Sequence, residues 1–108
     1  MADLDPADRA AAVASVRDEN GTPVVYLSGE LDLTSAGQFS TAIDAALSSH
    51  PGTLILDASG LSFMDSSGIV LLVSATQRVQ EVRVRDPSPI VRRLIELTGL
   101  SNVLRITS

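Results

Sequence analysis

The chain has no cysteine, no tryptophan and no lysine, and it has one histidine. Without cysteine there is no disulfide, no thiolate nucleophile and no cysteine-bound metal. Without lysine, a Schiff-base enzyme and a lysine-bearing phosphate loop are excluded. The longest apolar run is Ile69–Val73, far shorter than the roughly 20 residues that span a bilayer. We therefore expect neither redox chemistry at a thiol nor insertion into a membrane.

What is present predicts one small globular domain. The 108 residues are 44% hydrophobic and 19% charged, which is ordinary for a folded domain of about 100–200 residues. Residues 1–10 carry three aspartates and a proline, and we expect them to form a flexible leader before a single domain at 11–108. The N-terminus lacks the basic and apolar regions of a signal peptide, which predicts a cytoplasmic protein.

Charge is distributed unevenly along the chain. The net charge is −5, so long-range attraction to nucleic acid is not expected. Residues 1–65 hold ten acids and two arginines, a net charge of −8, whereas residues 66–108 hold six arginines and three acids, a net charge of +3. Two interpretations stay open: ordinary surface solvation, or a dipolar surface that orients a partner.

The first half of the sequence predicts a hairpin and a helix. Strands at 13–17 and 24–28 flank Asn20-Gly21, a pair that favours a tight hairpin turn. A helix is expected to begin after Ser35, with Gln38 at the spacing of a capping box. Its apolar stripe recurs at helical spacing, on Phe39, Ile43, Ala46 and Leu47.

The second half predicts three strands and two helices. A strand at 53–57 should be followed by a loop at 58–65, and a helix should begin near Ser66. Its expected core stripe is Ile69, Leu72, Val73 and Thr76. A strand at 82–85 precedes a helix capped by Ser88, with Pro89 at its first position and a left-handed end at Gly99. A last strand is expected at 103–106, and the inward residues of the last helix are Ile90, Val91, Leu94 and Ile95.

This order, β-β-α-β-α-β-α-β, predicts an α/β fold. The β-α-β segments imply parallel strands with right-handed crossovers. The strands alternate apolar and polar residues, which favours helices on one face only. The predicted architecture is a two-layer sandwich with a mixed sheet.

Candidate functional residues follow two of the strands. Sites in such sheets collect at the carboxyl ends of the strands, where Asp32 and the segment 63–68 (Phe-Met-Asp-Ser-Ser-Gly) are expected. Asp32, Asp65 and Ser66 could converge there, and the N–H groups at a helix start favour added negative charge. Each also has an ordinary interpretation: Asp65–Gly68 as a helix-start turn, and Asp32 as a loop acid or helix cap.

Several segments together resemble the STAS domain, and more narrowly the bacterial anti-sigma factor antagonists. They are residues 27–32 (Leu-Ser-Gly-Glu-Leu-Asp), 61–68 (Leu-Ser-Phe-Met-Asp-Ser-Ser-Gly), and Ser88-Pro89 with Leu94 and 98–100 (Thr-Gly-Leu). The resemblance covers roughly residues 13–106, and it implies the STAS-like two-layer sandwich.

The resemblance implies a binding switch rather than an enzyme. The unphosphorylated protein would bind an anti-sigma factor that is also a serine kinase, and so free a sigma factor. Phosphorylation of Ser66 would end that binding, and a serine phosphatase would reverse it. Asp32, Asp65, Ser67 and Val70 are the candidate partner-binding residues; Val70 is chosen because it lies four residues past Ser66 on one helix face. No catalytic residue, cofactor, metal, nucleic acid or membrane is expected, and a homodimer stays open.

The sequence departs from the family pattern at two places. The usual Gly-Gly turn after the motif helix is missing from 77–82, which predicts a shortened helix. The chain also stops just after the last strand, where many relatives continue into a final helix. We expect this to leave an apolar patch open for a partner or a dimer.

Three functions other than a binding switch make different demands on the sequence. A hydrolase would need glycine two residues before the nucleophilic Ser66, where Met64 stands. It would also need His50 within hydrogen-bond reach, but the sheet should separate the pair by roughly 15 Å; His50 is instead interpreted as a cation at a helix C-terminus. A stand-alone STAS module that binds a nucleotide or lipid, and a phospho-regulated scaffold component of a stress-signalling complex, remain as alternatives.

Overall fold

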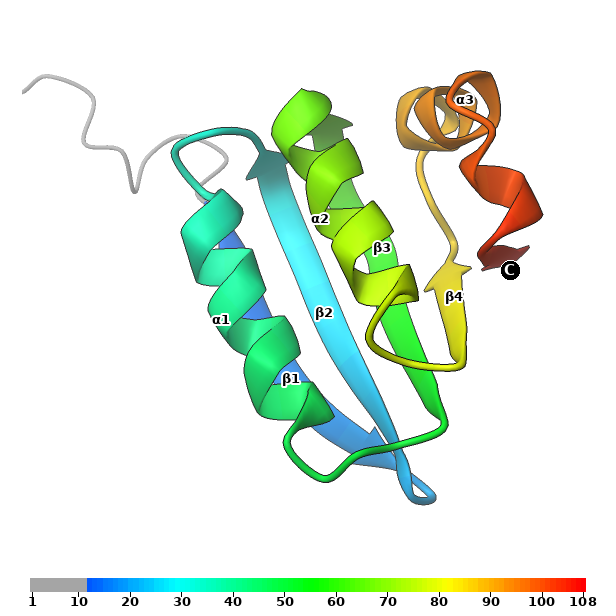
Figure 1. The fold of residues 1–108 in the computed structure, drawn as a ribbon. Helices are drawn as coiled ribbons and strands as arrows, with labels where there is room; N and C mark the ends of the chain where they lie inside the picture. The colour runs from blue at the N-terminus through cyan, green and yellow to red at the C-terminus, as the bar shows by residue number, and fades with distance from the viewer. Residues whose placement is uncertain (1–11) are drawn as a thin grey trace, which may run out of the picture.

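The computed structural model describes residues 12–108 (Figure 1). The predicted leader at 1–10 lies outside this range. The elements are β1 (Val13–Glu19), β2 (Thr22–Leu31), α1 (Ala36–Leu47), β3 (Thr53–Met64), α2 (Ser66–Thr76), β4 (Glu81–Arg85), α3 (Pro89–Leu97), a short 3-10 helix η2 (Leu100–Asn102) and β5 (Arg105–Thr107).

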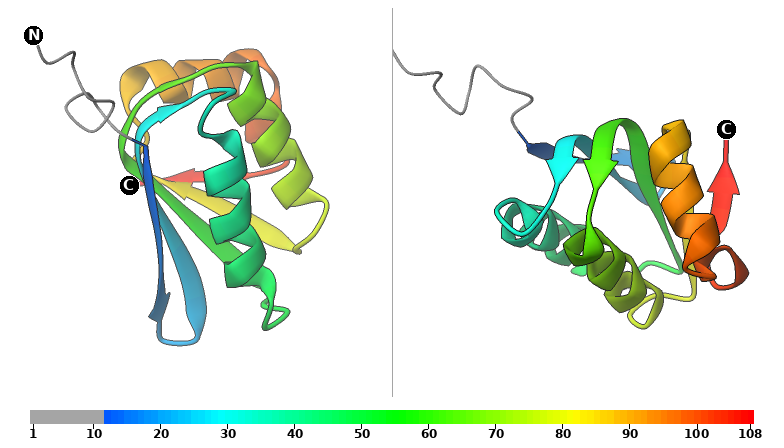
Figure 2. Two further views of the ribbon diagram at one scale, coloured as in Figure 1. Left: turned by 90° about the vertical axis from the view of Figure 1, so that its left-hand side faces the viewer. Right: turned by 90° about the horizontal axis from the view of Figure 1, so that it is seen from above.

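The five strands lie in the sheet in the same order as in the chain. β1 and β2 are antiparallel, and the other three pairs are parallel. The helices cover one face of this mixed sheet, with α1 and α2 side by side (Figures 1 and 2). The predicted two-layer α/β sandwich is therefore confirmed. None of the helices in this part of the chain is long and apolar enough to cross a membrane.

Strand order gives the charge asymmetry of the sequence a direction in space. Because the strands follow chain order, the acidic residues of 12–65 lie toward the β1–β2–α1 side and the arginine-rich second half forms the β4–α3–β5 side. The β1–β2 hairpin turns at Asn20 and Gly21, both with positive φ (55° and 90°), as the sequence predicts.

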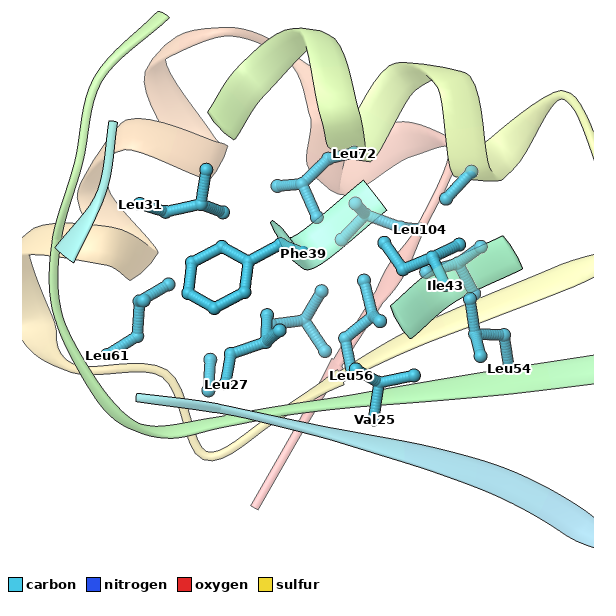
Figure 3. Packing of buried hydrophobic residues seen from close by; sticks show 14 of the residues in the cluster. Val25, Leu27, Leu31, Phe39, Ile43, Leu54, Leu56, Leu61, Leu72 and Leu104 are labelled. Carbon is cyan, nitrogen blue, oxygen red and sulfur yellow. The ribbon is translucent and has the colours of Figure 1, made fainter. Parts of the chain in front are cut away.

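The α1 stripe is confirmed, but the capping box is wrong. Phe39 is fully buried at the centre of the core, among leucines of both layers (Figure 3), and Ile43, Ala46 and Leu47 are buried beside it. Gln38 does not cap the helix: its amide donates to the Ala12 carbonyl at 2.9 Å. The Ser35 hydroxyl instead donates to the Glu30 carbonyl at 2.7 Å.

The loop predicted at 58–65 is wrong, because β3 continues to Met64. The inward-facing residues explain the error: they are spaced two apart at first and then three apart, at Leu54, Leu56, Ala58, Leu61 and Met64. Two register shifts against β2 produce this change of spacing. An extended strand with two irregularities loses the alternation by which strands are recognised. β2 is also longer than predicted, and residues 29–31 belong to it.

The start of α2 at Ser66 is confirmed, and its predicted core stripe is confirmed in part. The buried residues are Gly68, Leu72 and Ala75. Ile69 and Val73 are half-buried and pack against the core, and Thr76 is half-buried. Residues 69–73 are all apolar, so their periodicity does not single out one face of the helix.

The end of the fold agrees with prediction at its caps and differs in two details. The Ser88 hydroxyl accepts from the Val91 amide at 3.4 Å, and Gly99 has φ of 78°. Ile90, predicted inward, is 47% exposed. The last strand begins at Arg105 rather than at residue 103, because the η2 turn continues through bonds from residues 103 and 104 to the Leu100 carbonyl.

Candidate partner-binding site

The carboxyl ends of β2 and β3 lie directly side by side. The last pair in their ladder joins Leu31 to Met64, and the Asp65 amide donates to the Leu31 carbonyl at 3.1 Å. Asp32 and Asp65 are thus the first residues past two adjacent strands, which lie about 4.8 Å apart. The predicted convergence of the two aspartates with Ser66 is what this backbone geometry produces.

Asp65 caps α2 and leaves Ser66 open to solvent. The Asp65 Oδ1 atom accepts from the Ser67 amide at 2.7 Å, and the Asp65 carbonyl accepts from the Gly68 amide at 3.0 Å. Ser66 is the exposed first residue of the helix, whereas Ser67 is half-buried. Of the two adjacent serines, Ser66 is the more exposed, and the helix start favours negative charge there.

Gly68 fixes the distance between α2 and the strand ends. A Cβ at this position would lie 2.1 Å from Met64 Cγ and 3.3 Å from Leu31 Cδ1. Both of these side chains are fully buried, so they cannot move aside without disturbing the core. The glycine therefore lets the first turn of the helix pack on both strands that carry the site.

Asp32 holds the connection from β2 to α1, as in the first of its ordinary interpretations, a loop acid, since the N-cap of α1 is Ser35. Its Oδ1 atom accepts from the Thr34 hydroxyl at 2.6 Å, the Thr34 amide at 2.9 Å and the Ser35 amide at 3.2 Å. These bonds, above all the one from the Thr34 hydroxyl, lower the pKa of the Asp32 carboxyl. The residue contributes to local structure as well as to charge.

The edge carries negative charge that is not paired with any arginine or histidine of residues 12–108. None of the ion pairs among residues 12–108 includes Glu30, Asp32 or Asp65. Negative charge added at Ser66 would therefore enter an acidic region, with only the N–H groups of the helix start to offset it.

Exposed apolar residues surround this acidic edge. Val70 is 67% exposed, as its predicted role requires, and it lines a groove of about 400 Å³ between α1 and α2. Sequence reasoning missed Leu33, 80% exposed, and Phe63, 39% exposed. Leu33 is the one apolar residue in the otherwise polar connection at 32–35, and that contrast was the signal that could have marked it as an exposed contact residue. The edge thus combines acidic and apolar surface, which is common in protein interfaces.

A second polar cluster lies on the helix-free face of the sheet, and sequence reasoning did not find it. The Arg85 guanidinium donates to Asp57 at 2.8 Å, Glu19 at 3.1 Å and the Tyr26 hydroxyl at 3.2 Å. Burial raises the pKa of Asp57, but the hydrogen bonds from Ser59 and Arg85 lower it by more, so the pKa lies below its ordinary value. Arg85 likewise lowers the pKa of Glu19. The cluster joins four strands, and its one guanidinium bonds to both carboxylates.

Two other features lie away from the edge. His50 is exposed and precedes β3, whereas Ser66 follows β3, so the twelve residues of this strand separate His50 from Ser66 by roughly 30 Å or more.

A cleft of about 540 Å³ lies between β4, β5 and α3. Its lining includes Glu81, Arg92 and Glu96 beside apolar residues, so the surface there is mixed.

Comparison with known proteins assigns the family. A family model described as "Mlab, STAS domain" matches residues 14–106. The anti-sigma-F factor antagonist RsfB of Mycobacterium tuberculosis is 32% identical over 97 residues, which are 87% of this chain and 80% of RsfB.

Solved structures agree. The crystal structure of an anti-sigma factor antagonist from Mycobacterium paratuberculosis has a TM-score of 0.83 at 30% identity, covering 89% of this chain and 85% of that one. The anti-sigma factor antagonist SpoIIAA matches in its unphosphorylated form (TM-score 0.74, 27% identity, 89% of each chain). Bacillus SpoIIAA in its phosphorylated form also matches (TM-score 0.68, 26% identity, 89% of this chain and 92% of that one). The chain therefore belongs to the STAS domain family and, within it, to the anti-sigma factor antagonists.

Proposed function

We propose that this protein is an anti-sigma factor antagonist whose binding is switched by phosphorylation of Ser66. With Ser66 unmodified, it binds an anti-sigma factor that is also a serine kinase, and a sigma factor is released. The kinase transfers phosphate to the Ser66 hydroxyl, and a serine phosphatase removes it. The names of the relatives support the antagonist function, and the solved phosphorylated form of SpoIIAA supports a phosphorylation switch.

One observation carries the assignment of Ser66. It is the exposed first residue of α2, and it directly follows a strand end that lies beside Asp32. A phosphate adds about −1.5 to −2 charges at pH 7. Repulsion within the acidic edge, together with desolvation at an interface, would cost about 2–5 kcal/mol of binding. That corresponds to roughly 30-fold to several-thousand-fold in affinity, which is enough for a switch.

The same phosphate need not unfold the protein. The partial positive charge at the start of α2 offsets part of the repulsion, and Ser66 is exposed. We therefore expect the phosphorylated protein to keep its fold and to lose its partner. Asp32 and Asp65 supply the charge that repels the phosphate, Ser67 supports the helix start, and Val70 adds apolar contact area for the partner.

The assignment is tested by phosphosite mapping. The full chain is incubated with ATP and each candidate anti-sigma factor kinase of the same organism, and the product is mapped by mass spectrometry. We expect phosphate on Ser66, no incorporation in Ser66→Ala and normal incorporation in Ser67→Ala. Phosphate on Ser67 in the wild type would overturn the assignment. Undiminished kinase binding after stoichiometric phosphorylation would overturn the switch.

The contribution of Val70 is tested by replacing it with serine. Val70→Ser should leave stability within about 0.5 kcal/mol, since the side chain is exposed. Affinity for the unphosphorylated partner should fall about 5- to 30-fold, as for a moderate interface contact. Val103→Ser is the matched control, because Val103 is 59% exposed and lies after η2. Equal affinities for the two variants would remove Val70 from the interface.

A further inference from the structure

β3 reaches the phosphoacceptor edge through two bulges that its neighbour β2 does not match. Val24 pairs with Ile55, and Leu31 pairs with Met64. Seven steps along β2 therefore correspond to nine steps along β3, and two residues of β3 are extra. Bulges insert residues in this way and often lie next to functional sites.

The first bulge is held by Asp57. It places Ala58 and Ser59 opposite Leu27 alone. The Asp57 Oδ1 atom accepts from the Ser59 amide at 3.0 Å and from the Ser59 hydroxyl at 2.6 Å. Gly60 follows, and a Cβ there would lie 3.2 Å from the Leu27 carbonyl oxygen and 2.9 Å from a side-chain carbon of β2. A bound carboxylate and a glycine thus define this irregularity.

The second bulge is held by Ser62. This residue has no partner on β2, because the pairing steps from Gly29 with Leu61 to Glu30 with Phe63. The Ser62 hydroxyl donates to the Gly29 carbonyl at 3.0 Å. Gly29 itself is buried with φ of 87°, a conformation that favours glycine. Both strands therefore depart from regular geometry at this point, and one side-chain hydrogen bond spans the departure.

Two extra residues have a consequence that one would not have. A single extra residue would exchange the two faces of the strand beyond it, and Met64 would leave the core. Two extra residues restore the inward direction of Met64 and shorten the reach of the strand. Without them, Asp65 would lie about 6.6 Å farther along the sheet, at about 3.3 Å per residue, and it would no longer stand beside Asp32.

We propose that these two bulges set the position of the phosphoacceptor, which makes Asp57 and Ser62 positioning residues for the phosphorylation of Ser66. The proposal rests on the function proposed above for Ser66. Both residues act through the backbone of β3, since Asp57 fixes the first extra residue and Ser62 fixes the second. A hydroxyl held in one orientation is phosphorylated faster than one on a backbone that samples several conformations, because orientation contributes directly to the rate.

The experiment compares three variants of the full chain. Ser62→Ala removes the hydroxyl that holds the second bulge, and Ser62→Thr restores a hydroxyl. Ser48→Ala is the matched control, because the Ser48 hydroxyl also donates to a carbonyl, that of Ala45 at 2.7 Å, next to the end of α1. The first readout is amide hydrogen exchange at Asp65, whose N–H makes the bond that links it to the end of β2. The second is the kinetics of Ser66 phosphorylation by the kinase identified by phosphosite mapping.

We expect Ser62→Ala to speed exchange at Asp65 about fivefold, which is the effect of losing one hydrogen bond. It should lower kcat for Ser66 by a similar factor with KM nearly unchanged, and Ser62→Thr should recover both. Ser48→Ala should change neither. Equal behaviour of Ser62→Ala and Ser48→Ala in exchange overturns the positioning role. The exchange measurement needs no kinase. If no kinase phosphorylates the wild-type protein, that result counts against the proposed function, and the exchange rates still decide whether Ser62 positions Asp65.

Discussion

β2 and β3 lie side by side in the centre of the sheet, yet they reach the same edge by different means. β2 keeps its inward positions two apart, at residues 25, 27, 29 and 31, with one departure from regular geometry at Gly29. β3 breaks alternation twice and is held at each break by a polar side chain. Regular hydrophobic alternation is sufficient to place the end of β2. The end of β3 depends on particular side-chain hydrogen bonds, so the position of Ser66 is more sensitive to single substitutions.

The two strand ends also use their aspartates differently. Asp32 accepts three hydrogen bonds from the residues of a long connection. Asp65 accepts one from Ser67 and starts the next helix at once. The first aspartate shapes a loop, and the second sets a helix start with an exposed serine on it. Variants that act on one strand and spare the other can measure how far this difference extends.

Deletion of Ile55 should have the largest effect, and deletion of Ser62 a much smaller one. Ile55 lies in the regular part of β3 between the fully buried Leu54 and Leu56, so its deletion would turn one of these leucines out of the core. Loss of a buried leucine side chain costs about 2–5 kcal/mol, so we expect the free energy of unfolding in urea to fall by at least about 3 kcal/mol. Ser62 is an extra residue without a partner on β2, and its deletion leaves Met64 opposite Leu31. Similar losses of stability for the two deletions would show that Ser62 is not the extra residue of a bulge.

Gly68→Ala should have the next largest effect, because α2 would be pushed away from both strand ends. The added methyl would clash with Met64, and overpacking of a core costs about 1–3 kcal/mol. Gly37→Ala is the matched control in α1, where an added Cβ meets nothing within 4 Å. It should be neutral or stabilise the protein by up to about 1 kcal/mol. Thermal unfolding of both variants decides the point, and equal stabilities would contradict the packing role of Gly68.

The same contrast between regular and irregular patterns explains which elements could be predicted from the sequence. The stripe of α1 was predicted fully because polar residues separate its apolar positions, and β2 was recognised as a strand from its β-branched residues next to the Asn20-Gly21 turn. The predicted strand at 53–57 ended too early because inward positions three apart resemble no regular strand. The stripe of α2 was predicted only in part because five successive apolar residues define no face. In both cases the missing information is tertiary: which neighbour each side chain packs against.

The placement of the candidate site residues at one sheet edge was predicted better than the strand that leads to them. Asp32, Asp65 and Ser66 needed only the order of strands and helices, since strand ends in a parallel sheet meet at one edge. The hydrogen bonds of Asp32 and the exposure of Leu33 needed the actual path of the connection. The Asp57–Arg85 pair needed the register between β3 and β4, which sequence spacing does not supply.

Asp57→Asn should have a moderate effect that depends on pH. The pKa of Asp57 is lower in the folded protein than its ordinary value, so the charged form stabilises the fold. This contribution is complete above about pH 4, near the unfolded pKa, and is lost as pH falls through the folded pKa. We expect the free energy of unfolding of the wild type to be about 1 kcal/mol larger than that of the variant at pH 7. This difference should shrink below about pH 4. Glu19 titrates in the same direction, so some acid sensitivity remains in the variant.

The control for this measurement is Asp44→Asn. Asp44 pairs with Arg78 on the exposed side of α1, and such surface pairs contribute within about 0.5 kcal/mol. Urea unfolding at a series of pH values measures both variants. A difference between wild type and Asp57→Asn that is the same at pH 3 and pH 7 would show that the charge of Asp57 does not stabilise β3.

Asp32→Asn and Asp65→Asn should have the smallest effects on stability and should separate charge from structure at the two strand ends. Asparagine keeps an oxygen that accepts the same N–H groups and is a good helix cap, so unfolding should change by no more than about 0.5 kcal/mol. Each variant removes one charge from the acidic edge, so phosphate on Ser66 should reduce partner affinity by a smaller factor than in wild type. Calorimetric titration of phosphorylated and unphosphorylated protein with the kinase measures that factor. If it is unchanged in both variants, repulsion from the strand-end aspartates is not what makes phosphorylation a switch, and steric exclusion by the phosphate at the interface becomes the explanation.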